Sequence, residues 1–426
     1  MLVISLALIG VPIAFVLAMV ASGGIVYIAG WDSLLYSLGS YPFGRVTAFT
    51  MVVIPLFVLM GELTVASGTA EDAYNLAERW LGRLRGGLVI ASLGAQGLIA
   101  ACTGSGVTGT VAMGKIAVPE MRKRGYDEGL AVGAVAAGGT VGVLIPPSLG
   151  LVVYGVATNT SIGDLFIAGI IPGIISVFIY QMMVFIRCWF NPKLAPLADK
   201  YNWNERLIGL VKGWGIVAMF TTVMVGLYGG FITPMEVGAV ASLIGIVLWI
   251  ISKRRGRASW AGLKGAFWNT AKLCGMIFAL LIGGGLFSLF VVMSGSIPPI
   301  TEFFVNLPFP RFVTALILCL MYIPMGMFLD GMSMTLLTAP IVFPIIVYGL
   351  GYSPVWFGIV QIKLHELGAI TPPVAINLFV AKGLFPDIKI ETIIRGTLWF
   401  MAMDIITFVF LFAFPAITTW LPSTMH

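Results

Sequence analysis

Long apolar segments follow one another along almost the whole chain, and they limit its fold more than any other feature. A segment of about 20 apolar residues is long enough to cross a bilayer as a helix. Hydrophobic residues make up 59% of the 426 residues and charged residues only 10%, whereas a soluble domain carries about 25% charged residues. The runs are too long and too even for the alternation of a membrane β-barrel. The sequence therefore predicts an all-α integral membrane protein that crosses the lipid bilayer many times.

Two apolar segments are interrupted at the middle by polar residues and glycines. Segment 88–120 contains CTGSGVTG and segment 312–349 contains MGMFLDGMS, and each is predicted to be a re-entrant helical hairpin. Segments 71–80 and 298–307 are predicted to be amphipathic helices along opposite membrane surfaces, and 191–213 a polar loop with an interfacial helix. The remaining spans are predicted at 2–28, 44–67, 128–158, 163–187, 212–230, 236–252, 266–292, 354–383 and 391–418.

Basic residues group in the short loops between the spans and indicate the topology. If both hairpins re-enter, every basic cluster lies on one face, and the opposite face keeps only Arg45 and Arg311. Because basic residues gather in cytoplasmic loops, the amino terminus is predicted to be cytoplasmic. The first hairpin then enters from the cytoplasm and the second from outside. The same placement explains the net charge of +6 without a nucleic-acid partner.

Matching motifs in the two halves of the chain indicate an internal repeat. LIPPSLG at 144–150 corresponds to AITPPVAI at 369–376, and KIAVPEM at 115–121 corresponds to TAPIVFPII at 338–346. An additional span lies between the halves, so the second copy is predicted to run with the opposite orientation. Inverted-topology repeats with broken helices at corresponding positions are typical of the binding sites of secondary transporters.

The double prolines explain why a helix would break inside a membrane. Each proline removes a backbone donor, and the freed backbone groups are tolerated only where they line a cavity or are buried in protein. Pro146 and Pro372 suit the first turn of a new half-helix. The glycines ahead of them are predicted to let the chain unwind: Gly138, Gly139, Gly142 and Gly368. Loose carbonyls suit a hard cation such as Na⁺ and a helix amino end suits an anion, although a plain proline kink is the alternative.

The hairpin tips carry further candidate ligands. At the first tip, hydroxyls and glycines alternate through Thr103, Gly104, Ser105, Gly106 and Thr108. At the second tip, Asp330, Gly331 and Ser333 occupy the equivalent place. A carboxylate at membrane depth is a functional candidate, so Asp330 is predicted to bind sodium. The same residue also suits the N-cap of the following helix, and the two roles are compatible.

Ionisable residues near the second break permit several interpretations. Lys363, His365 and Glu366 precede the prolines in KLHELGAITPP. Lys363 and Glu366 could neutralise each other as a buried pair, Lys363 could bind a substrate carboxylate, and Glu366 or His365 could carry a proton. For Glu62 and Asp404, pairing or snorkelling is the expected role.

Several other function classes are not supported by the sequence. GTVAMGKI at 109–116 lacks the Ser or Thr of a Walker A loop and has no preceding strand, so ATP-driven transport by this chain is not expected. The isolated cysteines and distant histidines give no metal-binding spacing. An intramembrane aspartyl protease using Asp330 and Asp404 lacks its motif, and a channel is less consistent with two unlike hairpin tips. No enzymatic activity is expected.

The combination of motifs resembles one transporter family over nearly all of the chain. The motifs are GSGVTGTVAMGKIAVPEM, GTVGVLIPPS, GLYGGFITPMEVGAVAS, MGMFLDGMSMTLLTAPIVFPI and GAITPPVAINLFVAKG. They resemble the large, DctM-like membrane subunit of TRAP (tripartite ATP-independent periplasmic) transporters. The resemblance implies an elevator fold of the ion transporter superfamily in the bacterial inner membrane. It also implies Na⁺-driven import of a small organic anion, a small four-helix membrane subunit and a periplasmic substrate-binding protein.

The same resemblance implies a division of the chain and a set of site residues. Scaffold helices with a cytoplasmic arm helix are expected at 1–87 and scaffold helices with a periplasmic arm helix at 161–310. Transport-domain halves are expected at 88–160 and 311–385, and a terminal helix at 386–426. Sodium is expected at Thr103, Gly104, Ser105, Gly106, Gly139, Gly142, Pro146, Asp330, Gly331, Ser333, Gly368, Thr371 and Pro372. Substrate is expected at Ser105, Thr108, Ser148, Lys363 and Asn377.

Two departures from the family pattern, VTGTVAMGK and KLHELG, leave the sodium ligands and the substrate open. Sialic acid, C4-dicarboxylates, keto acids and sulfonates all remain candidates. A stand-alone sodium–carboxylate symporter of the same superfamily is the alternative function.

Overall fold

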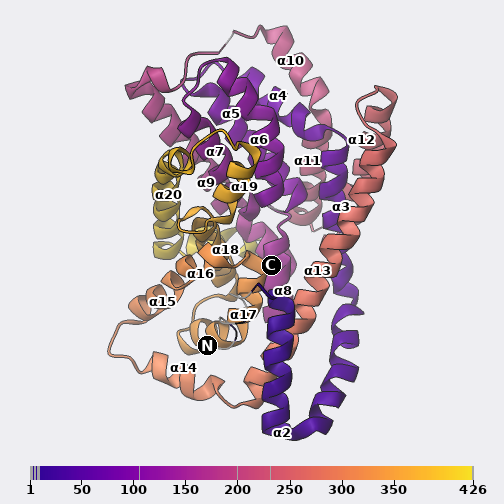
Figure 1. The fold of residues 1–426 in the computed structure, drawn as a ribbon, viewed down its shortest axis with the longest axis vertical. Coiled ribbons are helices and arrows are strands. Elements are labelled where there is room, and N and C mark those ends of the chain that lie inside the picture. Colours follow the sequence, from indigo (N-terminus) through magenta and orange to yellow (C-terminus); the bar gives the residue numbers. More distant parts are fainter. Residues whose placement is uncertain are drawn as a thin grey trace.

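The computed structural model describes residues 3, 6, 10–104, 106–198, 200–230 and 232–424. Within these ranges the chain is helical and contains no strand, which confirms the predicted all-α class. In the described part of the chain, eight helices are long and apolar enough to cross a membrane, and two further pairs of helices pass the same test together although each pair is bent. Figure 1 shows the helices running mainly along the long axis of the molecule.

The amino-terminal helix α2 (Ile13–Val46) reverses direction at its middle. Gly30 has φ 84° and ψ 176°, which is not helical, and the two legs form the V in Figure 1. The predicted span ends at 28, two residues before this bend, and the helix that resumes immediately after the bend was not predicted. Part of segment 2–28 lies outside the described residues. Helix α3 (Val53–Ala66) follows a 3₁₀ turn at Phe49–Val52.

Helix α13 (Trp260–Met293) packs along both α2 and α3. The contact with α2 is close at small residues: a Cβ on Gly283 would lie 2.1 Å from the carbonyl oxygen of Ala14. Helices α11 (Trp214–Tyr228) and α12 (Pro234–Arg254) complete this layer, with α12 against α3. Helices α2, α3 and α11 to α13 are called the outer helices below.

The first predicted hairpin and its broken helix are present. Helices α5 (Gly87–Thr103) and α6 (Gly106–Lys123) pack together and against α7 (Glu128–Val141). Helix α7 continues through a 3₁₀ turn at Gly142–Leu144, and the chain then bends by 43° into α8 (Leu149–Thr158). This group, 87–158, is called the first hairpin unit.

The second hairpin unit, 311–384, repeats the arrangement from the opposite end of the molecule (Figure 1). Its hairpin and broken helix consist of α15 (Arg311–Leu320), α16 (Tyr322–Phe328), α17 (Gly331–Phe343) with a π-helical continuation at Pro344–Gly349, α18 (Pro354–Ile370) and α19 (Ile376–Leu384). Helices α9 (Ile162–Phe190) and α20 (Ile390–Ala413) pack against both units, and α21 (Ala416–Ser423) packs on α9.

Polar contacts bring the basic clusters to one end of the molecule. Arm helix α4 (Thr69–Leu81) and the interfacial helix α10 (Trp203–Lys212) meet where Arg79 donates to the carbonyl of Glu205. Arg124, at the end of the first hairpin, forms a 3.0 Å ion pair with Glu78 of α4. The bidentate Arg257–Asp72 pair joins the α12–α13 loop to the same helix. Arm helix α14 (Ile297–Val305) lies at the opposite end (Figure 1), as the topology predicts.

Two of the glycines ahead of the double prolines, Gly139 and Gly368, have a role different from the predicted one, whereas Gly142 begins the 3₁₀ turn at the first break. Gly139 lies within α7 and Gly368 within α18, so neither belongs to an unwound segment. A Cβ on Gly139 would lie 2.5 Å from the carbonyl oxygen of Gly106, and one on Gly368 would lie 2.7 Å from the Cα of Gly326. Each glycine therefore lets a hairpin approach the backbone of its broken helix.

Candidate functional site

A cavity of about 350 Å³ lies where the two hairpin tips and the two broken helices converge. Seven of the predicted site residues line it: Thr103, Gly104, Gly106, Thr108, Asp330, Gly331 and Asn377. The outer helices α3 and α13 close the other side through Val58, Gly61, Glu62, Leu273, Met276 and Ile277. This central cavity therefore lies between the hairpin units and the outer helices.

The first tip turns tightly at Gly104, which has φ 61° and ends α5. The tip is in close contact with its surroundings: a Cβ on Gly106 would lie 2.6 Å from the carbonyl oxygen of Gly139, and one on Gly61 of α3 would lie 2.7 Å from the Cα of Thr103. Backbone and hydroxyl groups of the tip therefore face the central cavity in a constrained geometry. Ser105, predicted to bind both sodium and substrate, lies outside the described residues.

The second tip is organised by Asp330, whose carboxylate caps α17. The backbone N–H of Ser333 donates to Oδ1 and the Ser333 hydroxyl donates to Oδ2, each at 2.8 Å. This confirms the N-cap interpretation, while Asp330 also lines the central cavity. His365 lies against the tip, because a Cβ on Gly331 would approach its Nδ1 to 2.7 Å.

The double prolines lie in the breaks themselves and not in the first turns of new helices. Helix α8 begins at Leu149, after the N-cap residue Ser148, and α19 begins at Ile376, after Ala375 with φ 51°. Both proline pairs, Pro146–Pro147 and Pro372–Pro373, are joined by cis peptide bonds. The predicted position of Pro146 and Pro372 at the helix starts is wrong by three and four residues. Ser148, and not a proline, is the N-cap of α8, because its hydroxyl accepts from the N–H of Leu151.

The other predicted site residues lie beside the central cavity but do not line it. These residues are Gly139, Gly142, Pro146, Ser148, Ser333, Lys363, Gly368, Thr371 and Pro372. Their positions in the breaks and the adjoining turns make them part of the support of the cavity wall. Their predicted roles as sodium or substrate ligands stay predictions.

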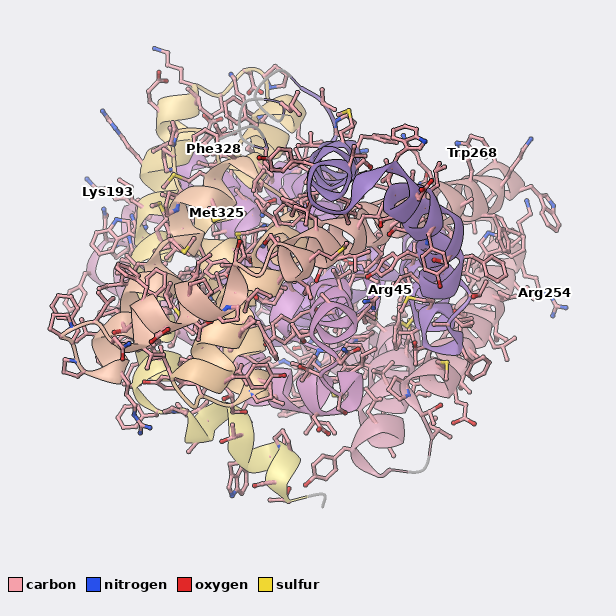
Figure 2. The ribbon with its side chains drawn as sticks, turned by 90° about the horizontal axis from the view of Figure 1, so that it is seen from below. Arg45, Lys193, Arg254, Trp268, Met325 and Phe328 are labelled. Carbon is pink, nitrogen blue, oxygen red and sulfur yellow. The ribbon has the colours of Figure 1, made fainter. Side chains whose placement is uncertain are left out.

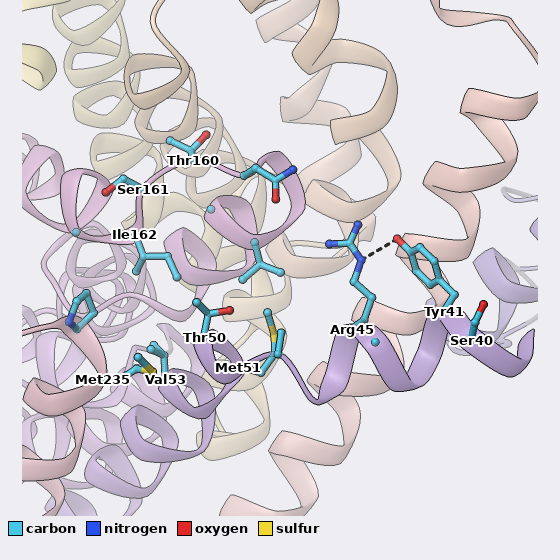
Figure 3. Close-up of a pocket in the computed structure, with 17 residues that line it drawn as sticks. Ser40, Tyr41, Arg45, Thr50, Met51, Val53, Thr160, Ser161, Ile162 and Met235 are labelled. Carbon is cyan, nitrogen blue, oxygen red and sulfur yellow. Dashed lines mark hydrogen bonds between the residues drawn. The ribbon is translucent and has the colours of Figure 1, made fainter. Parts of the chain in front are cut away.

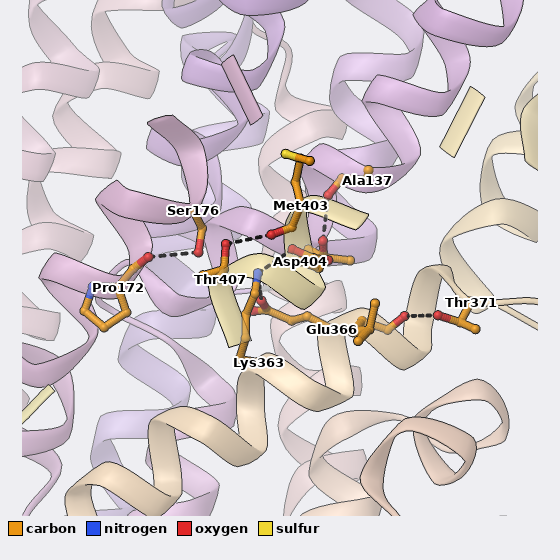
Figure 4. Close-up of polar contacts among 11 residues, drawn as sticks. Ala137, Pro172, Ser176, Lys363, Glu366, Thr371, Met403, Asp404 and Thr407 are labelled. Atoms are coloured by element: carbon orange, nitrogen blue, oxygen red, sulfur yellow. Dashed lines mark hydrogen bonds and ion pairs between the residues drawn. The ribbon is translucent and has the colours of Figure 1, made fainter. Parts of the chain in front are cut away.

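Lys363 is a buried member of an ion-pair cluster. Its side chain is fully buried, and Nζ lies 2.6 Å from Oδ1 of Asp404 on α20 and 3.6 Å from Oε2 of Glu366. Figure 4 shows the three side chains converging between α18 and α20. The geometry therefore supports the pairing interpretation, extended to Asp404, over contact between Lys363 and a substrate. Asp404 is paired with Lys363 and does not line the cavity that Asp330 lines, which is inconsistent with an aspartyl protease dyad.

Comparison with known proteins agrees with this geometry. The family model described as "Tripartite ATP-independent periplasmic transporter, DctM component" matches residues 1–417. The chain belongs to this family. It is thus a transporter subunit, a TRAP large permease, and not an enzyme.

Named relatives of this large permease differ in substrate. The C4-dicarboxylate TRAP transporter large permease protein DctM of Vibrio cholerae is 30% identical over 451 residues, covering 100% of this chain and 96% of its own. The isethionate TRAP transporter permease protein DctMQ of Oleidesulfovibrio alaskensis is 30% identical over 417 residues, covering 97% of this chain and 63% of that longer protein. The sialic acid TRAP transporter large permease protein SiaM of Vibrio cholerae is 28% identical over 382 residues, covering 89% and 88% of the two chains.

A solved structure shares the fold at low sequence identity. The YdaH transporter of Alcanivorax borkumensis superimposes with a TM-score of 0.68 at 14% identity, covering 95% of this chain and 97% of its own. This similarity confirms the arrangement of helices in the large permease.

The charged side chains that line the central cavity include three carboxylates. Its lining includes the carboxylates of Glu62, Asp330 and Glu366, and no Lys or Arg appears among the described lining residues. Both carboxylate oxygens of Glu366 are buried without a hydrogen-bond partner, and the 3.6 Å contact with Lys363 is its ion pair. A cavity of this charge favours a cation and disfavours an anion that enters alone.

Glu62 is the main lining residue that sequence reasoning assigned to another role. Its Oε2 accepts a 3.0 Å hydrogen bond from Nδ2 of Asn269 on α13, which holds it between two outer helices. The sequence feature that could have identified Glu62 as a site residue is its carboxylate within an apolar span. The other lining residues from α3 and α13 are apolar or glycine, and no local pattern distinguishes them from the rest of their helices.

A second, larger hollow of about 860 Å³ lies near Arg45. It is formed by the second leg of α2, the turn before α3, the end of α8 with the following loop, and the start of α12. Figure 3 shows Arg45 beside Tyr41, whose hydroxyl accepts a 2.8 Å hydrogen bond from Nε. This hollow contains neither hairpin tip, so the central cavity is the candidate ion and substrate site.

Proposed function

We propose that this large permease imports an organic anion across the bacterial inner membrane by coupling its entry to that of Na⁺. The anion would be delivered by a periplasmic substrate-binding protein, and the permease would act with a small four-helix membrane subunit, as membership of the family implies. The relatives named for C4-dicarboxylates, isethionate and sialic acid handle compounds with a carboxylate or sulfonate group. An acidic group is therefore the shared feature expected of the substrate.

The acidic lining of the central cavity supports coupling to a cation. Two carboxylates about 4 Å apart repel each other by about 4 kcal/mol at an effective dielectric constant of ~20, and an anionic substrate would experience repulsion of similar kind from Asp330, Glu62 and Glu366. Cations bound beside these groups remove that penalty. Binding of the anion would then require prior or simultaneous binding of sodium, which is the thermodynamic basis of symport.

The ligand chemistry near Asp330 suits sodium. A hard cation prefers carboxylate, carbonyl and hydroxyl oxygens, and the second tip offers the Asp330 carboxylate while the first offers the backbone around Gly104. Among the described residues no cluster of three His, Cys, Asp or Glu side chains could hold a transition metal. The cavity also lies between the hairpin units and the outer helices, so movement of the units past α3 and α13 would carry it across the membrane. That movement is the elevator mechanism that we propose.

Sodium-dependent stability of the purified protein tests this proposal without knowledge of the substrate. Thermal unfolding is measured in NaCl and in KCl of equal concentration. A ligand at ten times its dissociation constant stabilises the folded state by about 1.4 kcal/mol, so NaCl should raise the melting temperature above that in KCl.

The variant Asp330→Asn should lose the difference between the two salts. Asparagine caps helices about as well as aspartate, so the variant should fold and lose mainly the negative charge. Glu302→Gln on the exposed arm helix α14 is the control and should keep the difference. Equal sodium stabilisation in wild type and Asp330→Asn would refute the proposed sodium site.

A further inference from the structure

The hollow around Arg45 differs in charge from the central cavity. Arg45 is its one cationic residue, and the described lining contains no Asp or Glu. Ser40, Thr50, Thr160 and Ser161 add hydroxyl groups to the lining of the hollow. We propose that this hollow is an exterior binding site for the acidic group of the incoming organic anion, occupied before the anion reaches the central cavity. This inference rests on the proposed function for the nature of the substrate.

The two cavities lie in succession along the same pair of helices. Along the segment ending in α3, Met51 and Val53 line the Arg45 hollow, and Val58 and Glu62 line the central cavity. Since a helix rises about 1.5 Å per residue, Val53 and Glu62 are roughly 14 Å apart along α3. The Arg45 hollow is therefore displaced from the central cavity along α3, toward one face of the membrane.

Helix α8 gives the same order. Leu149 and Gly150 at its start line the central cavity, whereas Gly155 and Val156 near its end line the Arg45 hollow. The loop that follows α8 also belongs to the hollow, and α9 then returns to the end that carries the basic clusters. The hollow consequently faces the exterior side, on which the binding protein would release its ligand.

The contacts of Arg45 leave its charge available. Nε donates to the hydroxyl of Tyr41 and the guanidinium lies 5.1 Å from the centre of the same ring. No carboxylate of the described residues forms an ion pair with it, in contrast to Arg122, Arg124 and Arg257. A guanidinium held from one edge still presents paired N–H groups, the arrangement that binds a carboxylate or sulfonate in a bidentate manner.

Arg45 is half-buried and lies away from the periphery of the molecule in the end-on view. Seen from the end formed by α2 and α14, Arg45 lies inside the outline of the molecule, whereas Lys193 and Arg254 project from its periphery (Figure 2). Arg45 also lines a smaller hollow formed with α13 and α17. It therefore lies between the outer helices and the second hairpin unit, where an anion passing to the central cavity would meet it.

Thiol labelling with charged reagents measures the electrostatic effect of Arg45 on the hollow. The four native cysteines are all buried, so a cysteine introduced by Thr50→Cys in the hollow reacts selectively. The probes are the anionic reagent 2-sulfonatoethyl methanethiosulfonate and its cationic trimethylammonioethyl counterpart. We expect the ratio of anionic to cationic labelling rates to fall by about tenfold when Arg45→Gln is added, the lower end of electrostatic focusing. Arg45→Lys should retain part of the preference.

Arg311→Gln is the matched control, because Arg311 is the other cation predicted on this face and lies over the ring of Tyr352. It should leave the labelling ratio unchanged. The proposal would be overturned if the ratio of anionic to cationic labelling rates were the same with Arg45 and with Arg45→Gln. The labelling needs neither sodium nor transport, so its failure is distinct from a failure of the sodium test at Asp330.

A lipid headgroup could supply the same acidic chemistry, and vesicle composition separates the two sources. The ratio of anionic to cationic labelling rates is compared in phosphatidylcholine vesicles and in mixtures with phosphatidylglycerol. In each membrane, this ratio is divided by the ratio for the Arg45→Gln variant, which gives the part that depends on Arg45. A site for a soluble anion keeps its Arg45-dependent preference in both membranes. Loss of that preference in the anionic membrane would identify a lipid site and overturn the proposal.

Discussion

Replacing Lys363 tests whether its charge holds the centre of the protein together or binds the substrate. Lys363 Nζ is 2.6 Å from one carboxylate and 3.6 Å from another, with all three side chains almost fully buried. At 2.6 Å and an effective dielectric constant of ~20, the attraction to Asp404 is about 6 kcal/mol before the cost of desolvation. Removing one partner of a buried pair typically costs about 3–5 kcal/mol, because the remaining charge is left uncompensated.

Lys363→Met leaves two buried carboxylates, Asp404 and Glu366, without a cation. We therefore expect it to destabilise the protein by about 3–5 kcal/mol. Asp404→Asn should cost less, since Lys363 keeps Glu366 as a partner. The free energy of unfolding is measured by denaturant titration in detergent micelles, with a double-mutant cycle between positions 363 and 404 to isolate the pair.

The control for this prediction is an exposed ion pair on the first hairpin. Lys123 and Glu120 are 3.5 Å apart with 75% and 31% of their side chains exposed, so Lys123→Met should cost no more than about 1 kcal/mol. The contrary result would be a free energy of unfolding for Lys363→Met that lies within about 1 kcal/mol of the wild-type value, together with a higher substrate concentration for half-maximal transport. Lys363 would then bind substrate, and the structural reasoning would be refuted.

Further substitutions test the close contacts between hairpins and broken helices. Gly139→Ala places a methyl group 2.1 Å from Oγ1 of Thr110 and 2.5 Å from a backbone carbonyl oxygen. The yield of folded protein, measured by size-exclusion chromatography, should therefore fall sharply. Gly383→Ala is the control and should be neutral, because its Cβ would have no atom within 4 Å. Gly368→Ala should resemble Gly139→Ala, and normal folding of either would contradict the packing. Arg257→Gln, at a pair with 40% and 14% exposure, should lower the melting temperature only slightly, corresponding to about 1 kcal/mol or less; a large drop would show that the arm contact is essential.

Sequence patterns predicted the spans and hairpins well because long apolar runs and polar interruptions are local signals. The predicted spans 212–230 and 236–252 differ from α11 and α12 by two residues at each end. The reversal in α2 was missed because a single positive φ at Gly30 is hidden among apolar residues that suit a helix on both sides. Only the backbone conformation distinguishes that glycine from its neighbours.

The candidate site was predicted in part. Both tips and Asn377 line the central cavity as expected, but Gly139 and Gly368 support close packing and Lys363 is paired with Asp404, a residue on a different helix. A local motif carries no information on such distant partners. The apolar wall from α3 and α13 was not predictable either, since its side chains resemble those of any lipid-facing or core helix.

Sodium-driven uptake by the assembled transporter tests the central claim most directly. Proteoliposomes containing the large permease, the small membrane subunit and the periplasmic binding protein are supplied with the anion that a thermal-shift screen of that binding protein identifies. The account predicts that an inward sodium gradient drives accumulation of the anion, that potassium does not replace sodium, and that Asp330→Asn abolishes the sodium dependence. Accumulation of the anion to the same level without sodium would contradict the account. So would the same sodium dependence in the wild-type and Asp330→Asn transporters.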